Sequence, residues 1–223
     1  MNKLSGVLLV DKPASLSSAA VVAKIKNKFS IDKIGHGGTL DPFATGLLVL
    51  LLGEATKISR FFLGGKKTYL CTAKMGQETD TGDLTGKILT EDAPAMLGEQ
   101  NFPTLADWEN TRSQFLGKIM QTPPQYSALK HKGKALYEYA RKGEYIPLEA
   151  RAVEITDLEI LSYEPPFIRF RVSCSGGTYI RSLAQDWARG TNTRAHLTRI
   201  AERKKFPVFF GKSPLPRRSL TKK

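Results

Sequence analysis

Residues 35–46 read Gly35-His36-Gly37-Gly38-Thr39-Leu40-Asp41-Pro42-Phe43-Ala44-Thr45-Gly46, and no other part of the chain is as informative. Pro42 disfavours helical backbone angles at Asp41, which places the carboxylate on a stiff, extended loop. The glycines lack side chains, so a bulky group can approach the loop backbone closely. The stretch therefore predicts a site where Asp41 acts on a large substrate, with His36 five residues upstream. The alternative is an ordinary turn capped by the aspartate side chain.

Further short motifs lie on both sides of this loop. They are Asp11-Lys12-Pro13 with Ser17-Ser18, Gly53-Glu54-Ala55-Thr56-Lys57, Lys67-Thr68-Tyr69, Gly76-Gln77-Glu78-Thr79-Asp80-Thr81-Gly82-Asp83, Pro123-Pro124-Gln125-Tyr126-Ser127-Ala128, Cys174-Ser175-Gly176-Gly177-Thr178-Tyr179-Ile180-Arg181-Ser182 and Ala195-His196-Leu197-Thr198. In this order they resemble the TruB family of tRNA pseudouridine-55 synthases, from about residue 5 to about residue 200. So many ordered matches make the resemblance highly specific.

The resemblance implies a catalytic group of three residues. Asp41 matches the family's catalytic carboxylate. Arg181 matches its cationic partner, which would bind the carboxylate through two hydrogen bonds and help to keep it ionised. Tyr69 matches the residue that stacks on the target uracil, and the resemblance leaves open whether it also accepts or donates a proton. The alternative for Tyr69 is packing in the core, which is common for tyrosines in strands.

The resemblance also implies residues that bind the substrate or support the loop. Tyr179 would contact the edge of the base, and Ile200, where the family usually has leucine, would pack against the ring. His36 matches the residue that fills the gap left by a flipped base, although a lone histidine is more often structural. Lys12, with Pro13, is expected to brace the catalytic loop rather than to bind phosphate.

The pattern along the chain predicts strands and helices without a regular βαβ repeat. Ser17 is expected to cap a helix that runs to about Phe29, and residues 67–75 alternate as a strand does. The other expected elements are a buried strand over 4–10, helices over 54–63, 104–116 and 178–189, strands over 151–161 and 167–174, and core contacts at Leu105, Trp108 and Phe115. We therefore expect an α+β fold. The resemblance implies the pseudouridine synthase fold, with a mixed, largely antiparallel central sheet flanked by helices.

Residues 1–200 are expected to form one catalytic domain with a thumb-like insertion at 125–150. The insertion is hydrophilic and basic, with a short helical stretch near residues 135–141, and such a segment protrudes more easily than it packs. In the family, this region closes over the RNA stem-loop. Its candidate contacts to the RNA backbone are Lys130, Lys132, Lys134, Arg141 and Lys142.

Residues 201–223 are expected to form a short basic tail. The family usually continues here with an arginine-rich pair, whereas this chain has Ala201-Glu202. Many relatives also carry a C-terminal RNA-binding domain, and residues 201–223 are not expected to form a complete one. Its candidate RNA contacts are Arg203, Lys204, Lys205, Arg217 and Arg218.

The overall charge favours a polyanionic partner. The net charge is +13 and the sequence pI is about 9.8, and a basic protein gains affinity for nucleic acid by releasing counterions from phosphates. Basicity alone would also fit a ribosomal protein or a binder of anionic membranes. The acidic stretch at 76–92 and the defined site argue against the ribosomal protein.

The sequence indicates no cofactor and no metal. Forming pseudouridine changes no redox state and needs no energy input, and neither a P-loop nor a GxGxxG motif after a strand is found. His36, His131 and His196 lack metal-ligand spacing, and Cys71 and Cys174 lack the CxxC spacing of a zinc site, so a reducing cytosol fits best. The longest apolar stretch, residues 47–52, is too short to cross a bilayer, and no cleavable signal is expected.

We therefore expect a cytoplasmic, monomeric isomerase that needs no cofactor. It would flip uridine 55 out of the T-loop of tRNA and convert it to pseudouridine, with Asp41 as the catalytic carboxylate. The expected partner is the T-arm stem-loop, without a membrane or a metal. The alternative is a basic RNA-binding or RNA-chaperone protein that remodels tRNA without modifying it. The sequence leaves open whether Asp41 attacks the anomeric carbon, attacks carbon 6 of the base, or removes a ribose proton. It also leaves open whether other RNAs are substrates.

Overall fold

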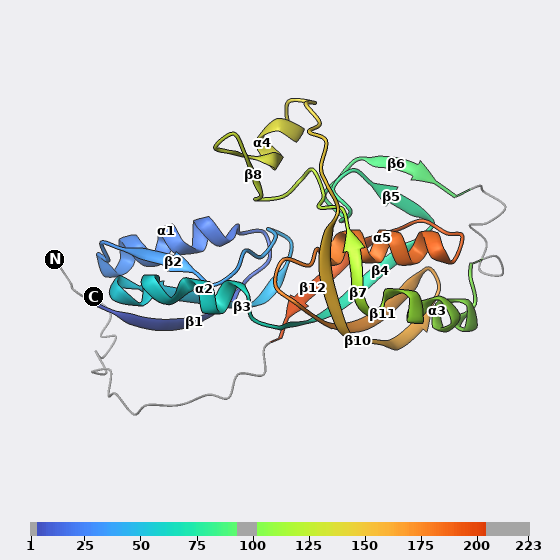
Figure 1. Cartoon of the computed structure of the whole chain (residues 1–223), viewed down its shortest axis with the longest axis horizontal. Helices are drawn as coiled ribbons and strands as arrows, with labels where there is room; N and C mark the ends of the chain where they lie inside the picture. The colour runs from blue at the N-terminus through green and yellow to red at the C-terminus, as the bar shows by residue number, and fades with distance from the viewer. Residues whose placement is uncertain (1–3, 93–101, 204–223) are drawn as a thin grey trace, which may run out of the picture.

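A central mixed sheet organises the molecule (Figure 1). The computed structural model describes residues 4–92 and 102–203. Within these ranges eight strands form the sheet in the order β1-β3-β12-β4-β11-β10-β7, with β2 paired to β3. The strands are β1 (Gly6–Lys12), β2 (Ile34–His36), β3 (Thr45–Leu52), β4 (Lys67–Met75), β7 (Gly117–Gln121), β10 (Arg151–Glu164), β11 (Phe167–Cys174) and β12 (Ala195–Glu202). Every pairing is antiparallel except that of β12 with β3, which confirms a mixed, largely antiparallel sheet.

Helices flank the sheet as expected for an α+β fold. They are α1 (Ser18–Phe29), α2 (Ser59–Leu63), α3 (Leu105–Arg112) and α5 (Ile180–Gly190), with 3-10 turns at Gly53–Ile58 and Ser113–Phe115. Trp187 of α5 is fully buried, and its ring meets that of Trp108 from α3 edge to face at 4.9 Å. This contact packs two helices that are far apart in the sequence into one core. It fixes the position of α5, whose first turn carries Arg181.

Several expected elements are confirmed. Strand β4 has the expected bounds, and its residues alternate between buried and half-buried because only one face packs on the core. Ser17 caps α1, since its side chain accepts a hydrogen bond from the Ala20 amide at 3.0 Å. Strands β10 and β11 also lie where the pattern placed them, although β10 continues to Glu164.

Three expectations are wrong in detail. The first strand is not buried, because β1 lies at the sheet edge, where one face is open and Val7 and Leu9 are about half exposed. Leu105 is exposed, because α3 faces the core through Trp108 instead. Helix α5 begins at Ile180, not at residue 178, because Tyr179 has extended backbone angles as its N-cap.

Strands β7 and β12 were not anticipated. Strand β12 lies in the middle of the sheet, between β3 and β4, and it extends through Glu202. Ile200 and Glu202 are both buried there, which brings two residues of a polar, charged segment into the interior beside the loop that carries Asp41.

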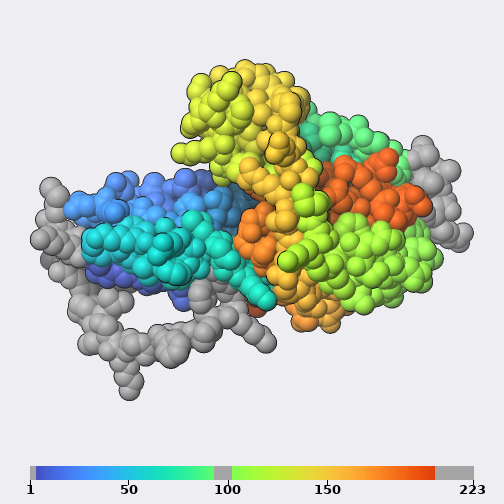
Figure 2. All heavy atoms as spheres, in the orientation of Figure 1, coloured from blue at the N-terminus to red at the C-terminus, as the bar shows by residue number. Residues whose placement is uncertain are grey.

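The segment 125–150 stands out from the body and carries a short hairpin and helix (Figure 1). These are β8 (Lys130–His131), β9 (Lys134–Ala135) and α4 (Leu136–Ala140), which confirms the expected short helix. Figure 2 shows this segment in yellow, overhanging the blue N-terminal part of the body. A second hairpin, β5 (Gln77–Thr79) with β6 (Ile88–Glu91), lies beyond the sheet. No helix within the described ranges is both long and apolar enough to cross a membrane.

Candidate active site

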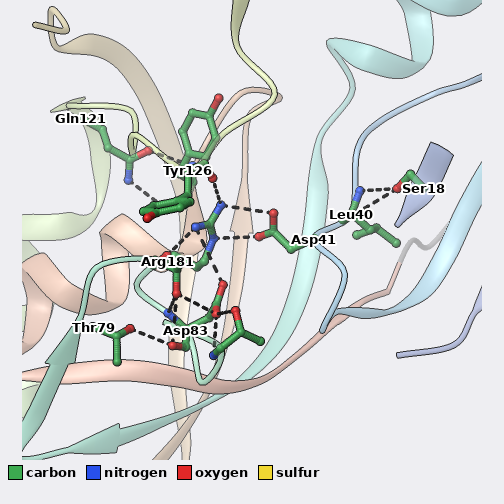
Figure 3. A network of polar contacts seen from close by, with 11 residues as sticks. Ser18, Leu40, Asp41, Thr79, Asp83, Gln121, Tyr126 and Arg181 are labelled. Carbon is green, nitrogen blue, oxygen red and sulfur yellow. Dashed lines mark hydrogen bonds and ion pairs between the residues drawn. The ribbon is translucent and has the colours of Figure 1, made fainter. Parts of the chain in front are cut away.

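Asp41 and Arg181 form a two-point ion pair at the start of α5 (Figure 3). Arg181 donates from Nε to Asp41 Oδ2 at 2.8 Å and from Nη2 to Asp41 Oδ1 at 3.2 Å. The two residues are 140 positions apart in the chain, so only the fold brings them together. The arginine side chain is 4% exposed and that of Asp41 is 34% exposed, which leaves the carboxylate within reach of a substrate. The bidentate geometry that the resemblance implied is confirmed.

Arg181 also holds the segments around the carboxylate. It donates to the carbonyl oxygens of Thr81 and, at 2.8 Å, of Tyr126, and its Nη1 lies 3.9 Å from Asp83 Oδ2. A guanidinium has five donors in a rigid plane and can serve several acceptors at once. One buried cation therefore links the loop that carries Asp41, the segment after β5 and the base of the thumb to α5.

The pKa of Asp41 lies above the ordinary carboxyl value. Desolvation by the surrounding atoms is the largest cause, and the charge of Asp83 acts in the same direction. The charge and hydrogen bonds of Arg181 lower the pKa but do not outweigh the burial. The expectation that Arg181 favours the ionised form is therefore confirmed in direction only.

Two buried polar side chains pin the loop on either side of Asp41. The Lys12 ammonium is fully buried and donates to the carbonyl oxygens of Pro13 (2.9 Å), Leu16 (2.6 Å) and Pro42 (3.1 Å). The Ser18 hydroxyl bonds both the amide and the carbonyl of Leu40, at 2.9 and 3.1 Å. All three donors of Lys12 thus go to backbone carbonyls, one of them next to Asp41.

A cavity of about 330 Å³ opens in front of Asp41. It is lined by five of the residues assigned to the site from the sequence, namely Asp41, Tyr69, Tyr179, Arg181 and Ile200. Tyr69 comes from β4 and Ile200 from β12, two strands that pair in the middle of the sheet. Tyr69 also packs in the core, as the alternative for this residue expected. The cavity is of a size that suits small ligands and presents apolar and aromatic walls beside a carboxylate.

His36 lies in a second cavity of about 660 Å³, which shares Asp41 and Arg181 with the first. This cavity is also lined by Tyr126, Tyr137 and Arg141 of the thumb. Burial lowers the pKa of His36, a hydrogen bond to the Gly38 backbone opposes this, and the Lys67 charge lowers it further. A neutral imidazole therefore lies in the larger cavity near Asp41, and His36 does not line the smaller one.

The thumb residues assigned to RNA contacts are all exposed. Lys130, Lys132, Lys134, Arg141 and Lys142 have their side chains at the surface, and Arg141 also lines the larger cavity. Arg203 is exposed as well, and its amide bonds the carbonyl of Thr68. The remaining tail residues assigned to RNA contacts, 204, 205, 217 and 218, lie outside the described residues.

Several residues of the site were missed from the sequence. The buried Gln121 amide accepts a hydrogen bond from the Tyr179 amide at 2.8 Å and donates to the Tyr179 carbonyl at 3.1 Å. Ser18 and Asp83 stood in recognised motifs without an assigned role. Gln121 carried no signal, because its strand was not anticipated. Among the described residues, no three His, Cys, Asp or Glu side chains gather closely enough to hold a metal ion.

Known proteins with similar sequences point to one family. The family model described as TruB family pseudouridylate synthase (N terminal domain) matches residues 26–180. A protein of Hydrogenovibrio crunogenus named tRNA pseudouridine synthase B is 45% identical over 196 residues, which cover 88% of this chain and 63% of that protein. One of Bordetella pertussis with the same name is 47% identical over 197 residues, covering 88% of this chain and 79% of that protein. The chain thus spans less than two thirds of the first of these relatives.

Solved structures support the fold. The crystal structure of a Cbf5-Nop10-Gar1 complex contains a chain that matches with a TM-score of 0.65 at 27% identity, over 91% of this chain and 49% of that one. A structure of an H/ACA RNP bound to a substrate RNA containing 2'-deoxyuridine matches with a TM-score of 0.63 at 24% identity, over 89% of this chain and 47% of that one. The family model matches residues 26–180, and the Bordetella pertussis protein is 47% identical. The chain therefore belongs to the TruB family of pseudouridylate synthases.

Proposed function

We propose that this protein converts a uridine of tRNA to pseudouridine. The reaction breaks the bond between N1 of the base and the sugar, rotates the uracil and rejoins the sugar to carbon 5. The observation that carries the proposal is the Asp41–Arg181 pair at a cavity walled by Tyr69, Tyr179 and Ile200. The names of the relatives, tRNA pseudouridine synthase B, agree with this activity.

Asp41 is the catalytic carboxylate in this proposal. An ionised carboxylate near the bond between base and sugar can act in any of three ways. It can attack the anomeric carbon, attack carbon 6 of the base, or remove a ribose proton. Arg181 engages both carboxylate oxygens and so offsets part of the cost of desolvating the charge. Tyr69 and Ile200 form surfaces against which the uracil ring packs, and Tyr179 meets the base edge.

The substrate is proposed to be uridine 55 in the T-loop, which must leave its stack to reach the cavity. His36 lies in the adjoining larger cavity, where a neutral planar ring can occupy the space that the base leaves. The thumb carries exposed basic side chains beside this cavity, suited to the phosphates of a T-arm stem-loop. We propose that the protein acts on this stem-loop as a cytoplasmic monomer without a metal ion.

Mapping pseudouridine by chemical labelling tests the proposed function directly. Purified protein incubated with unmodified tRNA should form pseudouridine at position 55 only. Binding of the tRNA without any pseudouridine would favour the RNA-chaperone alternative, and pseudouridine at other positions would contradict the T-loop assignment.

His36→Ala should slow the reaction on folded tRNA more than on an isolated, flexible T-loop oligonucleotide. Flipping a base out of a stacked loop costs a few kcal/mol, and a gap-filling ring recovers part of that cost. We expect a loss of about tenfold or more on folded tRNA and a smaller loss on the oligonucleotide. Single-turnover rates on both substrates measure the effect. His131→Ala in the thumb serves as the control and should affect both alike, and equal losses for His36→Ala would contradict the gap-filling role.

Replacing single thumb lysines by glutamine should weaken tRNA binding mainly at low salt. Each lost phosphate contact should reduce the slope of log affinity against log salt by about 0.7 to 0.9. Titrations of Lys130→Gln, Lys132→Gln and Lys134→Gln across a salt series measure this. Lys118→Gln, an exposed lysine of β7, removes the same charge outside the thumb and should leave the slope unchanged. An equal change in the control would show that only net charge matters.

A further inference from the structure

A buried ion pair lies beside Tyr69, on the side of the sheet that faces the catalytic loop. Lys67 Nζ and Glu202 Oε1 are 3.5 Å apart, and the two side chains are 9% and 4% exposed. Removing two charges from water is costly, and such a pair adds little net stability. The pair lies next to Tyr69, the proposed base-stacking residue, so its function is to be sought in the site.

The strand register places the three side chains together. Glu202 of β12 lies directly opposite Tyr69 of β4 in the antiparallel pairing, so both side chains are on one face of the sheet. Lys67 precedes Tyr69 by two residues and shares that face. Lys67 and Tyr69 also line the small cavity in front of Asp41.

The Glu202 carboxylate lies beside the phenol of Tyr69, near enough for its negative charge to act on the hydroxyl. Burial raises the pKa of this phenol well above the ordinary tyrosine value, and the neighbouring Glu202 carboxylate raises it further. The hydroxyl is therefore protonated, and because a carboxylate can only accept, the phenol is the donor in a hydrogen bond between these two groups.

Lys67 connects this pair to the catalytic loop. Its ammonium contacts Gly38 so closely that a side chain at position 38 would collide with it. The backbone of Glu202 likewise packs on Gly46 at the other end of the loop. The ion pair therefore lies between Tyr69 and both ends of the segment that carries Asp41.

We propose that Glu202 is a positioning residue that acts through Tyr69, with Lys67 as its balancing charge. By accepting a hydrogen bond from the phenol, Glu202 fixes the hydroxyl so that an oxygen lone pair, not the proton, is presented to the cavity. The pair also holds the tyrosine at a set distance from the Asp41 loop. The inference rests on the proposed function, in which Tyr69 packs against the target uracil.

Glu202→Gln should lower the single-turnover rate constant on unmodified tRNA by about tenfold to a hundredfold, because small errors in position cost rates of this order. The affinity for tRNA should be unchanged. In a Tyr69→Phe background the same substitution should have no further effect, since the residue it acts through is gone. Glu159→Gln, which breaks an exposed ion pair with Arg171 in the same sheet, is the matched control and should retain the wild-type rate. Equal fold losses in both backgrounds, or a wild-type rate in Glu202→Gln, would overturn the proposal.

A double variant controls for a loss of folding in Glu202→Gln. Glu202→Gln alone leaves the Lys67 ammonium buried without its partner, which can prevent folding. Lys67→Met with Glu202→Gln removes both charges. It should fold and show a rate loss at least as large as that expected for the single variant. A folded double variant with the wild-type rate would overturn the proposal.

The contact itself can be followed without any activity. Incorporated 3-fluorotyrosine lowers the pKa of the phenol, and the 19F signal of residue 69 is the one missing from Tyr69→Phe. Its titration midpoint should fall in Glu202→Gln, because the neighbouring negative charge is removed. An unchanged midpoint would overturn the proposal even in an active enzyme. If the protein forms no pseudouridine, the proposed function fails, and the titration still decides whether Glu202 holds the phenol.

Discussion

Asp41→Asn should abolish pseudouridine formation, with a loss of at least about a thousandfold, while tRNA binding stays close to that of the wild type. The amide keeps the shape of the carboxylate and still accepts hydrogen bonds from Arg181, but it is a far poorer nucleophile and base. Binding depends mainly on contacts to the RNA backbone. Single-turnover assays by chemical labelling and filter binding on the same tRNA measure the two quantities.

A matched control for this substitution is Asp157→Asn. Asp157 pairs with Arg171 at 3.4 Å on the surface of the sheet, where both side chains are nearly half exposed. Its loss removes the same charge from an aspartate–arginine pair away from the cavity, and activity should be retained. Appreciable turnover by pure Asp41→Asn protein would refute Asp41 as the catalytic residue.

Arg181→Met should have the largest effect on stability. It leaves Asp41 and Asp83 without their nearest buried cation and removes the donor to the carbonyls of Thr81 and Tyr126. Breaking a buried pair by removing one partner typically costs about 3–5 kcal/mol. Denaturant unfolding should therefore show a large decrease in the free energy of unfolding. Arg171→Met, at the surface, should change it little. Similar small losses for both variants would contradict the central role of Arg181.

Arg181→Lys tests the electrostatic part of this role through pH. The pKa of Asp41 is already above its ordinary value, and Arg181 opposes that shift. If the ionised carboxylate is the active form, kcat/KM rises as pH increases through this pKa. A lysine keeps a charge but cannot form the bidentate contact, so the pKa should rise further and the acidic limb of the profile should move to higher pH. An unmoved limb would show that Asp41 does not titrate in this step.

Local patterns predicted elements whose cause is itself local. Strand β4 was identified because one of its faces is buried and the other is less so, which produces an alternation of period two. The start of α1 was identified because Ser17 caps it with its own side chain. The loop that carries Asp41 was recognisable because Pro42 restricts the backbone angles of Asp41. The glycines, which lack side chains, leave the loop backbone accessible.

The fold alone decided which of these residues meet. Glu202 reads as a lone acid in a basic tail, yet pairing with a strand 135 residues earlier buries it against Lys67. Gln121 holds Tyr179 across 58 residues, and β1 is half exposed only because it lies at the sheet edge. Burial and partner choice depend on contacts between segments distant in the chain. Local periods do not record such contacts, and only the family resemblance anticipated one of them, the Asp41–Arg181 pair. Caps, turns and alternation, in contrast, are set by neighbours a few positions away.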